Sequence, residues 1–365
     1  MKKILLLCAA AMMAAVGASA QQLKVTDSEG NAVAYASVMN AKAEYIGITD
    51  LDGVLADVKG AAEVIVTHVA FKTKNVTLNG KDTVVVLEDA DFDMPEITVE
   101  PKPFIYVQTF YRLYIYTSED GIFYYRAGLT DNTYDPAKKT VKGKTEAASK
   151  AKSALLKTLF GMVGVVFNDY SQIKPKSFEE RMMEHGKASK VKFTAGGQAG
   201  QTISDYKGVI GSVTDDMADH LRRYSYDSYK LFLHNLEAKG REKDLKRLEK
   251  KVERNEKRKN KVESDYFLYR IDDSGHYGPE DFVMSQNMSS WDEEEDGKTK
   301  HYIIAMQVFC TDRAYVTKDE LKERVKRNKM KMNYQNIRRF EQDHHIPSLP
   351  AAVQQKLSEI WKAGD

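Results

Sequence analysis

The chain has 365 residues, of which 42% are hydrophobic and 30% are charged, and its formal net charge is +2. This length exceeds that of one typical domain, so we expect two domains with separate cores. The near balance of charges gives no general attraction to nucleic acid, which is therefore excluded as an expected partner.

The first 20 residues have the pattern of a secretory signal peptide. Lys2 and Lys3 precede an apolar run over residues 4–16, and small residues at 18–20 allow cleavage before Gln21. Loss of the two lysines leaves 53 basic residues (55 minus 2) against 53 acidic ones. No later stretch has the ~20 apolar residues of a membrane helix. We therefore expect an exported protein without a transmembrane helix, located in the periplasm, at the outer membrane or at the cell surface.

The two cysteines predict no disulfide. Cys8 lies in the signal and lacks the small neighbours of a lipidation site, so Cys310 is left alone after cleavage. Cys310 follows the apolar run 302–309, which is typical of a buried strand. We expect a buried, inert thiol and not a reactive one.

The segment from Leu23 to Val99 predicts an antiparallel β-sandwich of about seven short strands. Valine and threonine are frequent, and turns such as those at Gly30 and Gly53 recur between the apolar runs. The expected strands cover residues 23–26, 33–39, 45–49, 64–69, 76–78, 83–87 and 97–99.

The same segment carries an ordered motif. It reads Val25-x-Asp27-x-x-Gly30-x-x-Val33-x-Tyr35-Ala36-Ser37-Val38, followed by Gly47-x-Thr49-Asp50-x-Asp52-Gly53. This pattern resembles the carboxypeptidase regulatory-like domain over residues 23–99, although Ala70 stands where that family usually has glycine. The resemblance implies a transthyretin-like sandwich of the Gram-negative envelope, which in carboxypeptidases is accessory to a separate zinc domain.

Two aspartates in this motif could be interpreted as part of a calcium-binding loop. Asp50 and Asp52 lack the further oxygen ligands of an EF-type loop, because Lys59 and Gly60 stand where acids would be needed. A hairpin turn closed by Gly53 explains them better. No metal ligand is assigned here.

Two prolines mark the expected domain boundary. Pro101 and Pro103 block regular pairing and stiffen the chain, so we divide it into a signal (1–20), a sandwich (21–100), a linker (101–103) and an α+β domain (104–365). The predicted fold class is thus mainly β with a larger α+β domain that combines long antiparallel strands and charged helices.

The α+β domain opens with a strongly aromatic hairpin. Residues 104–116 predict a long strand, 118–121 a turn and 122–127 the returning strand, since Asp-Gly between β-rich runs favours a hairpin. Both faces carry aromatic rings. We expect either a core packed on both sides or one face that lines a groove.

The rest of this domain predicts alternating helices and strands. Segment 154–167 is too short to span a bilayer, and the charged segment 236–263 is interpreted as a solvated helix or a contact to acidic lipid. Expected helices cover 146–167 (in part strand), 178–187, 215–223, 236–263, 318–330, 333–343 and the segment after 348–350, and expected strands cover 265–271, 281–291 and 299–311, with an acidic loop at 292–297.

A search for chemistry finds no complete motif, so no catalytic, cofactor-binding or metal-binding residue is assigned. The nucleophile elbow is missing, and Ser-x-x-Lys occurs without its partner triplets. The glycine-rich run 196–200 lacks the lysine of a phosphate loop. The partial signals weighed were Ser149/Lys152, Ser171/Lys174, Glu180/Glu184/His185 and His344/His345.

Three functions remain open at this point. The first is an exported, non-enzymatic envelope protein in which the sandwich is accessory and the second domain binds an envelope protein or an apolar or glycan ligand, with peripheral membrane contact allowed. The second is a periplasmic carrier of lipid or another apolar ligand in a half-barrel. The third is a hydrolase, such as a peptidase, with an accessory sandwich.

Overall fold

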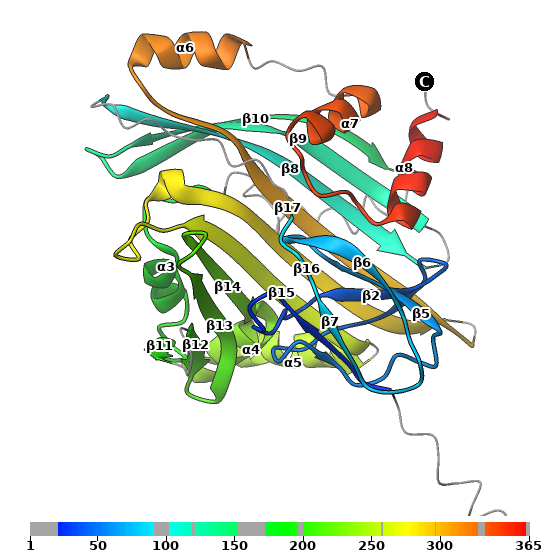
Figure 1. Cartoon of the computed structure of the whole chain (residues 1–365). Coiled ribbons are helices and arrows are strands. Elements are labelled where there is room, and N and C mark those ends of the chain that lie inside the picture. Colours follow the sequence, from blue (N-terminus) through cyan, green and yellow to red (C-terminus); the bar gives the residue numbers. More distant parts are fainter. Residues whose placement is uncertain are drawn as a thin grey trace, which may run out of the picture. The chain divides into compact units, whose positions relative to one another are not determined.

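The chain forms two units in a computed structural model (Figure 1). The structure describes residues 21–90, 102–118, 121–151, 172–195, 200–256, 258–295, 297–327 and 333–362. The first unit comprises Met1–His68 and Lys72–Asp89, and the second comprises Val69–Phe71 and Ala90–Asp365. Residues 91–101 lie outside the described residues, and they include Pro101 of the expected linker. Pro103, the other proline of that linker, is described.

The first unit consists of two small sheets. One has the order β4-β1-β7 and the other the order β3-β2-β5-β6. The strands are β1 (Leu23–Thr26), β2 (Ser37–Asn40), β3 (Tyr45–Ile48), β4 (Val54–Leu55), β5 (Glu63–His68), β6 (Phe71–Thr77) and β7 (Thr83–Val86).

Pairing in the first unit is not wholly antiparallel, which corrects the sequence-based expectation. β1 and β7 are parallel, with Leu23 opposite Thr83 and Thr26 opposite Val86. Parallel neighbours need a crossover connection, and the chain from β2 to β6 supplies it. The expected strand at 33–39 begins only at Ser37, and the one expected at 97–99 lies outside the described residues.

The segment at Asp50 is a tight turn, as the sequence predicts, but it is not a hairpin turn, because β3 before it and β4 after it belong to different sheets. The Asp50 carboxylate accepts hydrogen bonds from the backbone N–H groups of Asp52 (3.0 Å) and Val54 (2.8 Å). Gly53 has a φ of +71°, and a Cβ there would collide with the Val25 carbonyl. Glycine is therefore required, and the Asp50 oxygen that a cation would need is already used by the turn.

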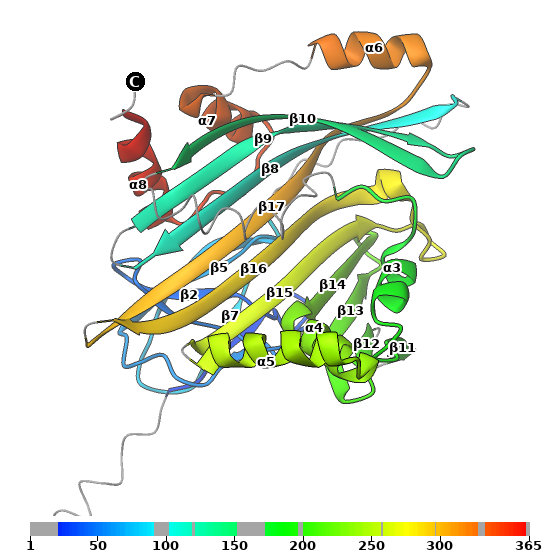
Figure 2. The same cartoon turned by 180° about the vertical axis from the view of Figure 1, so that it is seen from behind.

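The second unit is built on one ten-stranded sheet. Its order is β10-β9-β8-β17-β16-β15-β14-β13-β12-β11, and every neighbouring pair is antiparallel (Figure 2). The strands are β8 (Phe104–Thr117), β9 (Gly121–Asp135), β10 (Thr140–Ala151), β11 (Lys192–Ala195), β12 (Gly200–Asp205), β13 (Gly208–Asp216), β14 (Leu221–Asp227), β15 (Lys259–Arg270), β16 (Phe282–Glu295) and β17 (Lys298–Val316).

Three segments of this sheet differ from their expected structure. Residues 215–223 belong to β13, a turn and β14, and residues 259–263 belong to β15, although both were expected to be helical. Residues 146–151, expected to be a helix or a helix plus a strand, belong to β10. The acidic segment 292–297 is not a loop throughout, because Asp292–Glu295 continue β16. Antiparallel pairing with a neighbouring strand outweighs weak local preference in these cases.

The helices follow their predicted positions more closely. Their bounds are α3 (Phe178–His185), α4 (Ser228–Lys239), α5 (Glu242–Glu256), α6 (Lys318–Arg327), α7 (Tyr334–Asp343) and α8 (Ala351–Lys362), with a 3-10 turn η1 (Pro279–Asp281). The single helix expected over 236–263 is split at Gly240, whose φ of +59° ends α4. No described helix is long and apolar enough to cross a membrane.

The two faces of the large sheet carry different helices. α3 and α4 lie over one face, here named the α3 face, while α7 and α8 lie over the opposite one, the α7 face (Figures 1 and 2). Phe178 of α3 contacts Tyr224 and Phe267, whereas Phe340 of α7 contacts Phe110. Both faces of β8 are buried, as expected for a strand packed on two sides.

Candidate functional site

The α3 face is a continuous apolar surface over six neighbouring strands. Cross-strand register places Tyr111, Val308, Ser285, Phe267 and Tyr224 in one row across it. Its buried members include Val107, Leu113 and Ile115 of β8, Tyr124 of β9, Ile304, Met306 and Cys310 of β17, Phe282 and Trp291 of β16, Tyr269 of β15 and Tyr226 of β14.

Helix α3 is held on this face by aromatic packing and a carboxylate. Phe178 lies 4.1 Å from the Tyr224 ring and 5.1 Å from the Phe267 ring, centroid to centroid. Glu179 accepts hydrogen bonds from the Tyr224 hydroxyl and, at 2.6 Å, from the Tyr277 hydroxyl. Burial, together with these acidic and phenolic neighbours, raises the pKa of both tyrosines. They therefore stay neutral hydrogen-bond donors.

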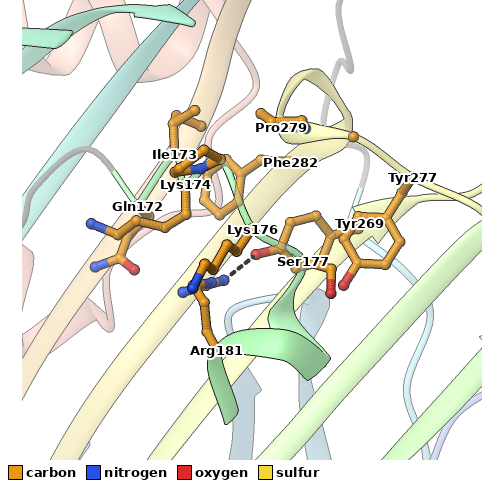
Figure 3. A pocket seen from close by; sticks show the side chains of 12 residues that line it. Gln172, Ile173, Lys174, Lys176, Ser177, Arg181, Tyr269, Tyr277, Pro279 and Phe282 are labelled. Atoms are coloured by element: carbon orange, nitrogen blue, oxygen red, sulfur yellow. Dashed lines mark hydrogen bonds between the residues drawn. The ribbon is translucent and has the colours of Figure 1, made fainter. Parts of the chain in front are cut away.

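A pocket of about 60 Å³ opens between the start of α3 and the connection from β15 to β16 (Figure 3). Its lining combines cations with apolar and aromatic side chains. The members are Gln172, Ile173, Lys174, Pro175, Lys176, Ser177, Arg181, Tyr269, Tyr277, Gly278, Pro279 and Phe282. Ile173, Tyr269 and Phe282 also belong to the apolar cluster of the α3 face, so the pocket opens directly onto that cluster.

Two cations of the pocket lie close enough to affect each other. Burial and the neighbouring Arg181 guanidinium lower the pKa of Lys174. Arg181 donates a hydrogen bond of 3.0 Å to the Tyr269 hydroxyl. Lys176, the third cation of the lining, is paired with Glu184.

The α7 face carries a buried polar network. Arg112 donates to Gln307 (2.6 Å), to Glu341 of α7 (2.8 Å) and to the Pro347 carbonyl (2.7 Å). Arg112 and Glu341 are 1% and 3% exposed. This network anchors the C-terminal helices to the sheet, because a buried ion pair is costly to break.

A second polar cluster on the α7 face has the connectivity of a serine-protease triad. His301 pairs through Nδ1 with Asp292, and its Nε2 lies 3.4 Å from the Ser290 hydroxyl. Asn260 donates to the second oxygen of Asp292 at 2.8 Å. Ser290 is only 1% exposed, so its hydroxyl offers no access to a substrate. We interpret the cluster as a structural tie between β16, β17 and β15.

The partial motifs found in the sequence do not converge. Glu180 forms the capping box of α3 with Ser177, while Glu184 pairs with Lys176. His344 packs on Phe340 at the end of α7. Lys174 lies in the pocket, whereas Lys152, Ser171 and residues 196–199 lie outside the described residues, as does the side chain of Ser149.

Cys310 behaves as the sequence predicts. It is fully buried in β17, and burial raises its pKa to about 11. At neutral pH the thiolate fraction is then on the order of one in 10,000, so the thiol is inert.

Sequence reasoning missed the pocket altogether. Lys174 was weighed only as part of a Ser-x-x-Lys signal with Ser171, and Arg181 only as a residue of the expected helix 178–187. The aromatic wall of the pocket comes from residues about 100 positions later. The signal that could have found the pocket is the cluster Lys174-Pro175-Lys176-Ser177, in which two lysines directly precede a helix cap.

Comparisons with known proteins give no family. No protein-family model matches the chain, and no curated protein sequence matches it. One solved structure with a partial likeness is lipovitellin, described for its lipid–protein interactions, at 7% sequence identity and a TM-score of 0.26. The match covers 59% of this chain and 26% of the lipovitellin chain. A likeness this distant carries no argument about fold or ligand.

Proposed function

We propose that the chain is an exported, non-enzymatic binding protein whose large sheet holds an amphiphilic ligand. The first unit would serve as an accessory module, a transthyretin-like sandwich of the carboxypeptidase regulatory-like kind. This assignment of the first unit rests on the motif between Val25 and Gly53 and on two small sheets of seven strands among its described residues.

One observation carries the ligand proposal. The pocket is polar and cationic at its rim, and it shares Ile173, Tyr269 and Phe282 with the buried apolar cluster of the α3 face. A ligand with a polar head and an apolar chain matches both halves of this lining. The volume of about 60 Å³ suits a head group, so the chain would enter by displacing side chains along the sheet.

Methionine methyl groups provide the test, because they report on each face separately. Met306 of β17 and Met182 of α3 are buried in the α3-face cluster, whereas Met284 and Met288 lie on the opposite face of β16. The chain from Gln21 is labelled with ¹³C-methyl methionine and titrated below micelle concentration with dodecyl phosphate and with monolaurin. Single Met→Leu variants assign the signals.

We expect saturable shifts of Met306 and Met182 with at least one of the two amphiphiles, while Met284 and Met288 stay in place. A titration in which neither amphiphile shifts Met306 or Met182 would refute amphiphile binding. Equal shifts on both faces would show non-specific association and would refute it as well.

A further inference from the structure

The wall of the pocket beside α3 contains a buried carboxylate oxygen without a hydrogen-bond partner. Gly278 lines the pocket, and a Cβ atom added to it would lie 2.5 Å from Glu280 Oε2, so this oxygen lies next to the glycine. Within the described part of the chain, Oε2 is buried and accepts no hydrogen bond. Burial raises the pKa of Glu280, because it removes the carboxylate from water. Such an oxygen is costly to leave unsatisfied and favours a donor beside it.

The groups around Glu280 hold its carboxylate without binding Oε2. The Tyr315 hydroxyl donates to Oε1 at 3.3 Å, and Arg313 Nη1 donates to the Glu280 carbonyl at 2.7 Å. The Gly278 N–H donates to the Asp281 carboxylate at 2.7 Å and so closes the turn η1. The turn therefore keeps the Glu280 carboxylate at the pocket wall with one of its two oxygens unused.

A buried donor in another part of the lining has no acceptor. Arg181 lines the pocket from α3, and its Nε is buried and makes no hydrogen bond to any described residue. Its Nη2 donates to the Tyr269 hydroxyl at 3.0 Å, and its guanidinium lies 5.7 Å from the centroid of the Phe178 ring. These contacts hold the guanidinium in place and leave Nε available. The site thus has an unused donor and an unused acceptor of opposite charge.

We infer that the pocket binds a neutral, hydroxyl-bearing head group such as that of a monoacylglycerol. The inference rests on the amphiphile-binding function proposed above and specifies its ligand class. A hydroxyl of the head donates to Glu280 Oε2, and another oxygen of the head accepts from Arg181 Nε. Both protein atoms are buried, so the head reaches them after a local movement of the lining.

The charges of the site favour a neutral head over an anionic one. The Arg181 guanidinium and the Glu280 carboxylate carry opposite charges, so a ligand that bridges them needs no net charge. An anionic head would satisfy Arg181 but would be repelled by Glu280. A head that lacks hydroxyl groups would leave Oε2 without a donor.

Four ligands separate this inference from the broader function. Monolaurin, its O,O-dimethyl ether, dodecyl phosphate and free glycerol are titrated by calorimetry into the chain from Gln21. The ether keeps the acyl chain and the acceptor oxygens of monolaurin but has no hydroxyl donor. We expect monolaurin to bind roughly tenfold more tightly, or better, than the ether, dodecyl phosphate and glycerol, because a site that pairs with a hydroxyl rejects analogues without one.

Two substitutions at the pocket wall test the carboxylate. Glu280→Met removes the acceptor and should reduce the preference for monolaurin over the ether to less than about threefold, with the ether affinity unchanged. Gly278→Ala should have the same effect, because its methyl group would displace Oε2. The φ of Gly278 is −114°, which alanine adopts without strain.

A third substitution tests the donor, and a fourth is the matched control. Arg181→Met removes a donor that monolaurin and the ether can both use, so it should weaken the two by a similar factor and preserve the preference between them. Glu237→Met repeats the change made at Glu280 on α4. Glu237 has a 45% exposed side chain, pairs with Lys207 and does not line the pocket. This control should change neither affinity.

Each outcome has a defined meaning. Equal affinity for monolaurin and the ether, or tighter binding of dodecyl phosphate, would overturn the neutral hydroxyl head but leave amphiphile binding standing. No binding of any amphiphile would overturn the proposed function itself. Glycerol that binds as tightly as monolaurin would show a site for free polyols and overturn the amphiphile head group. A preference that survives both Glu280→Met and Gly278→Ala would overturn the assigned acceptor.

Discussion

Arg112 shows how one residue joins distant parts of the chain. Its guanidinium contacts Gln307 of β17, Glu341 of α7 and the Pro347 carbonyl, which lie about 200 positions later in the sequence. The guanidinium also lies 5.3 Å from the centroid of the Phe309 ring. Planar, multiply donating arginine suits such a buried junction better than lysine.

Replacing Arg112 should destabilise the second unit. Arg112→Met leaves the 3% exposed Glu341 carboxylate with only Arg338 as its ionic partner and should cost about 3 kcal/mol in the free energy of unfolding. Urea denaturation followed by circular dichroism measures this change. The double variant Arg112→Met/Glu341→Leu should be more stable than Arg112→Met, because it removes a buried carboxylate that has lost its buried cationic partner. A double variant that is less stable than the single one would contradict this account.

At the level of elements, α3 positions the pocket. Its N-terminus is closed by a capping box in which Ser177 Oγ accepts from Glu180 N–H and the Glu180 carboxylate accepts from Ser177 N–H. The first turn carries Glu179, which fastens it to β14, and the next carries Arg181. The cap therefore affects both the stability of α3 and the position of the Arg181 side chain.

Ser177→Ala should lower stability by about 1 kcal/mol through loss of this cap. It should also weaken monolaurin binding, since the helix that carries Arg181 is less well fixed. Asn333→Ala is the control, because Asn333 caps α7 on the other face by accepting from Asn336 N–H at 2.9 Å. Its stability loss should be similar, with no change in calorimetric affinity. Equal loss of affinity in both variants would indicate general destabilisation.

Two errors of sequence-based prediction concern whole secondary-structure elements. Asp216 was expected inside a helix, but it ends β13, and its carboxylate accepts from the N–H groups of Ala218 and Asp219 in the turn to β14. Lys259 was expected at the end of a charged helix but pairs with Asp292 in the sheet. Local periodicity contains no information about the neighbouring strand, and that neighbour decided both cases.

Over the whole molecule, buried tyrosines govern the response to alkali. Burial raises the pKa of tyrosines on both faces of the sheet above the usual 10.0, namely Tyr114, Tyr125, Tyr224, Tyr226, Tyr269 and Tyr277. Above pH 10 the unfolded chain loses these protons while the folded chain keeps them. Stability therefore falls as pH rises past 10.

Lys174 has the opposite effect on stability. Because its pKa is lowered in the folded chain, the free energy of unfolding rises with pH up to the pKa of the unfolded chain, about 10.5. Burial also lowers the pKa of Lys261, which acts in the same sense. These two lysines are outnumbered by the six tyrosines, so we expect a steep net loss of stability above pH 10. Urea midpoints between pH 8 and 11 and tyrosinate absorbance at 295 nm measure it. The buried tyrosines should ionise together with unfolding. Reversible ionisation of all tyrosines near pH 10 without loss of structure would disprove this.

The amino-acid sequence alone determined much of the local structure. The aromatic hairpin at β8 and β9, the buried Cys310 strand and the turns at Gly30 and Gly53 all follow from short-range periodicity and turn chemistry. These features depend on neighbours within a few residues, which a linear pattern contains.

Only the tertiary structure decided the order of the ten strands, the parallel β1–β7 pair and the pocket. Lys174 and Arg181 meet Tyr269 and Phe282 in the pocket across about 90 to 110 positions of the sequence. Such encounters depend on which strands pair and in what register. Those pairings are long-range, and no local pattern encodes them.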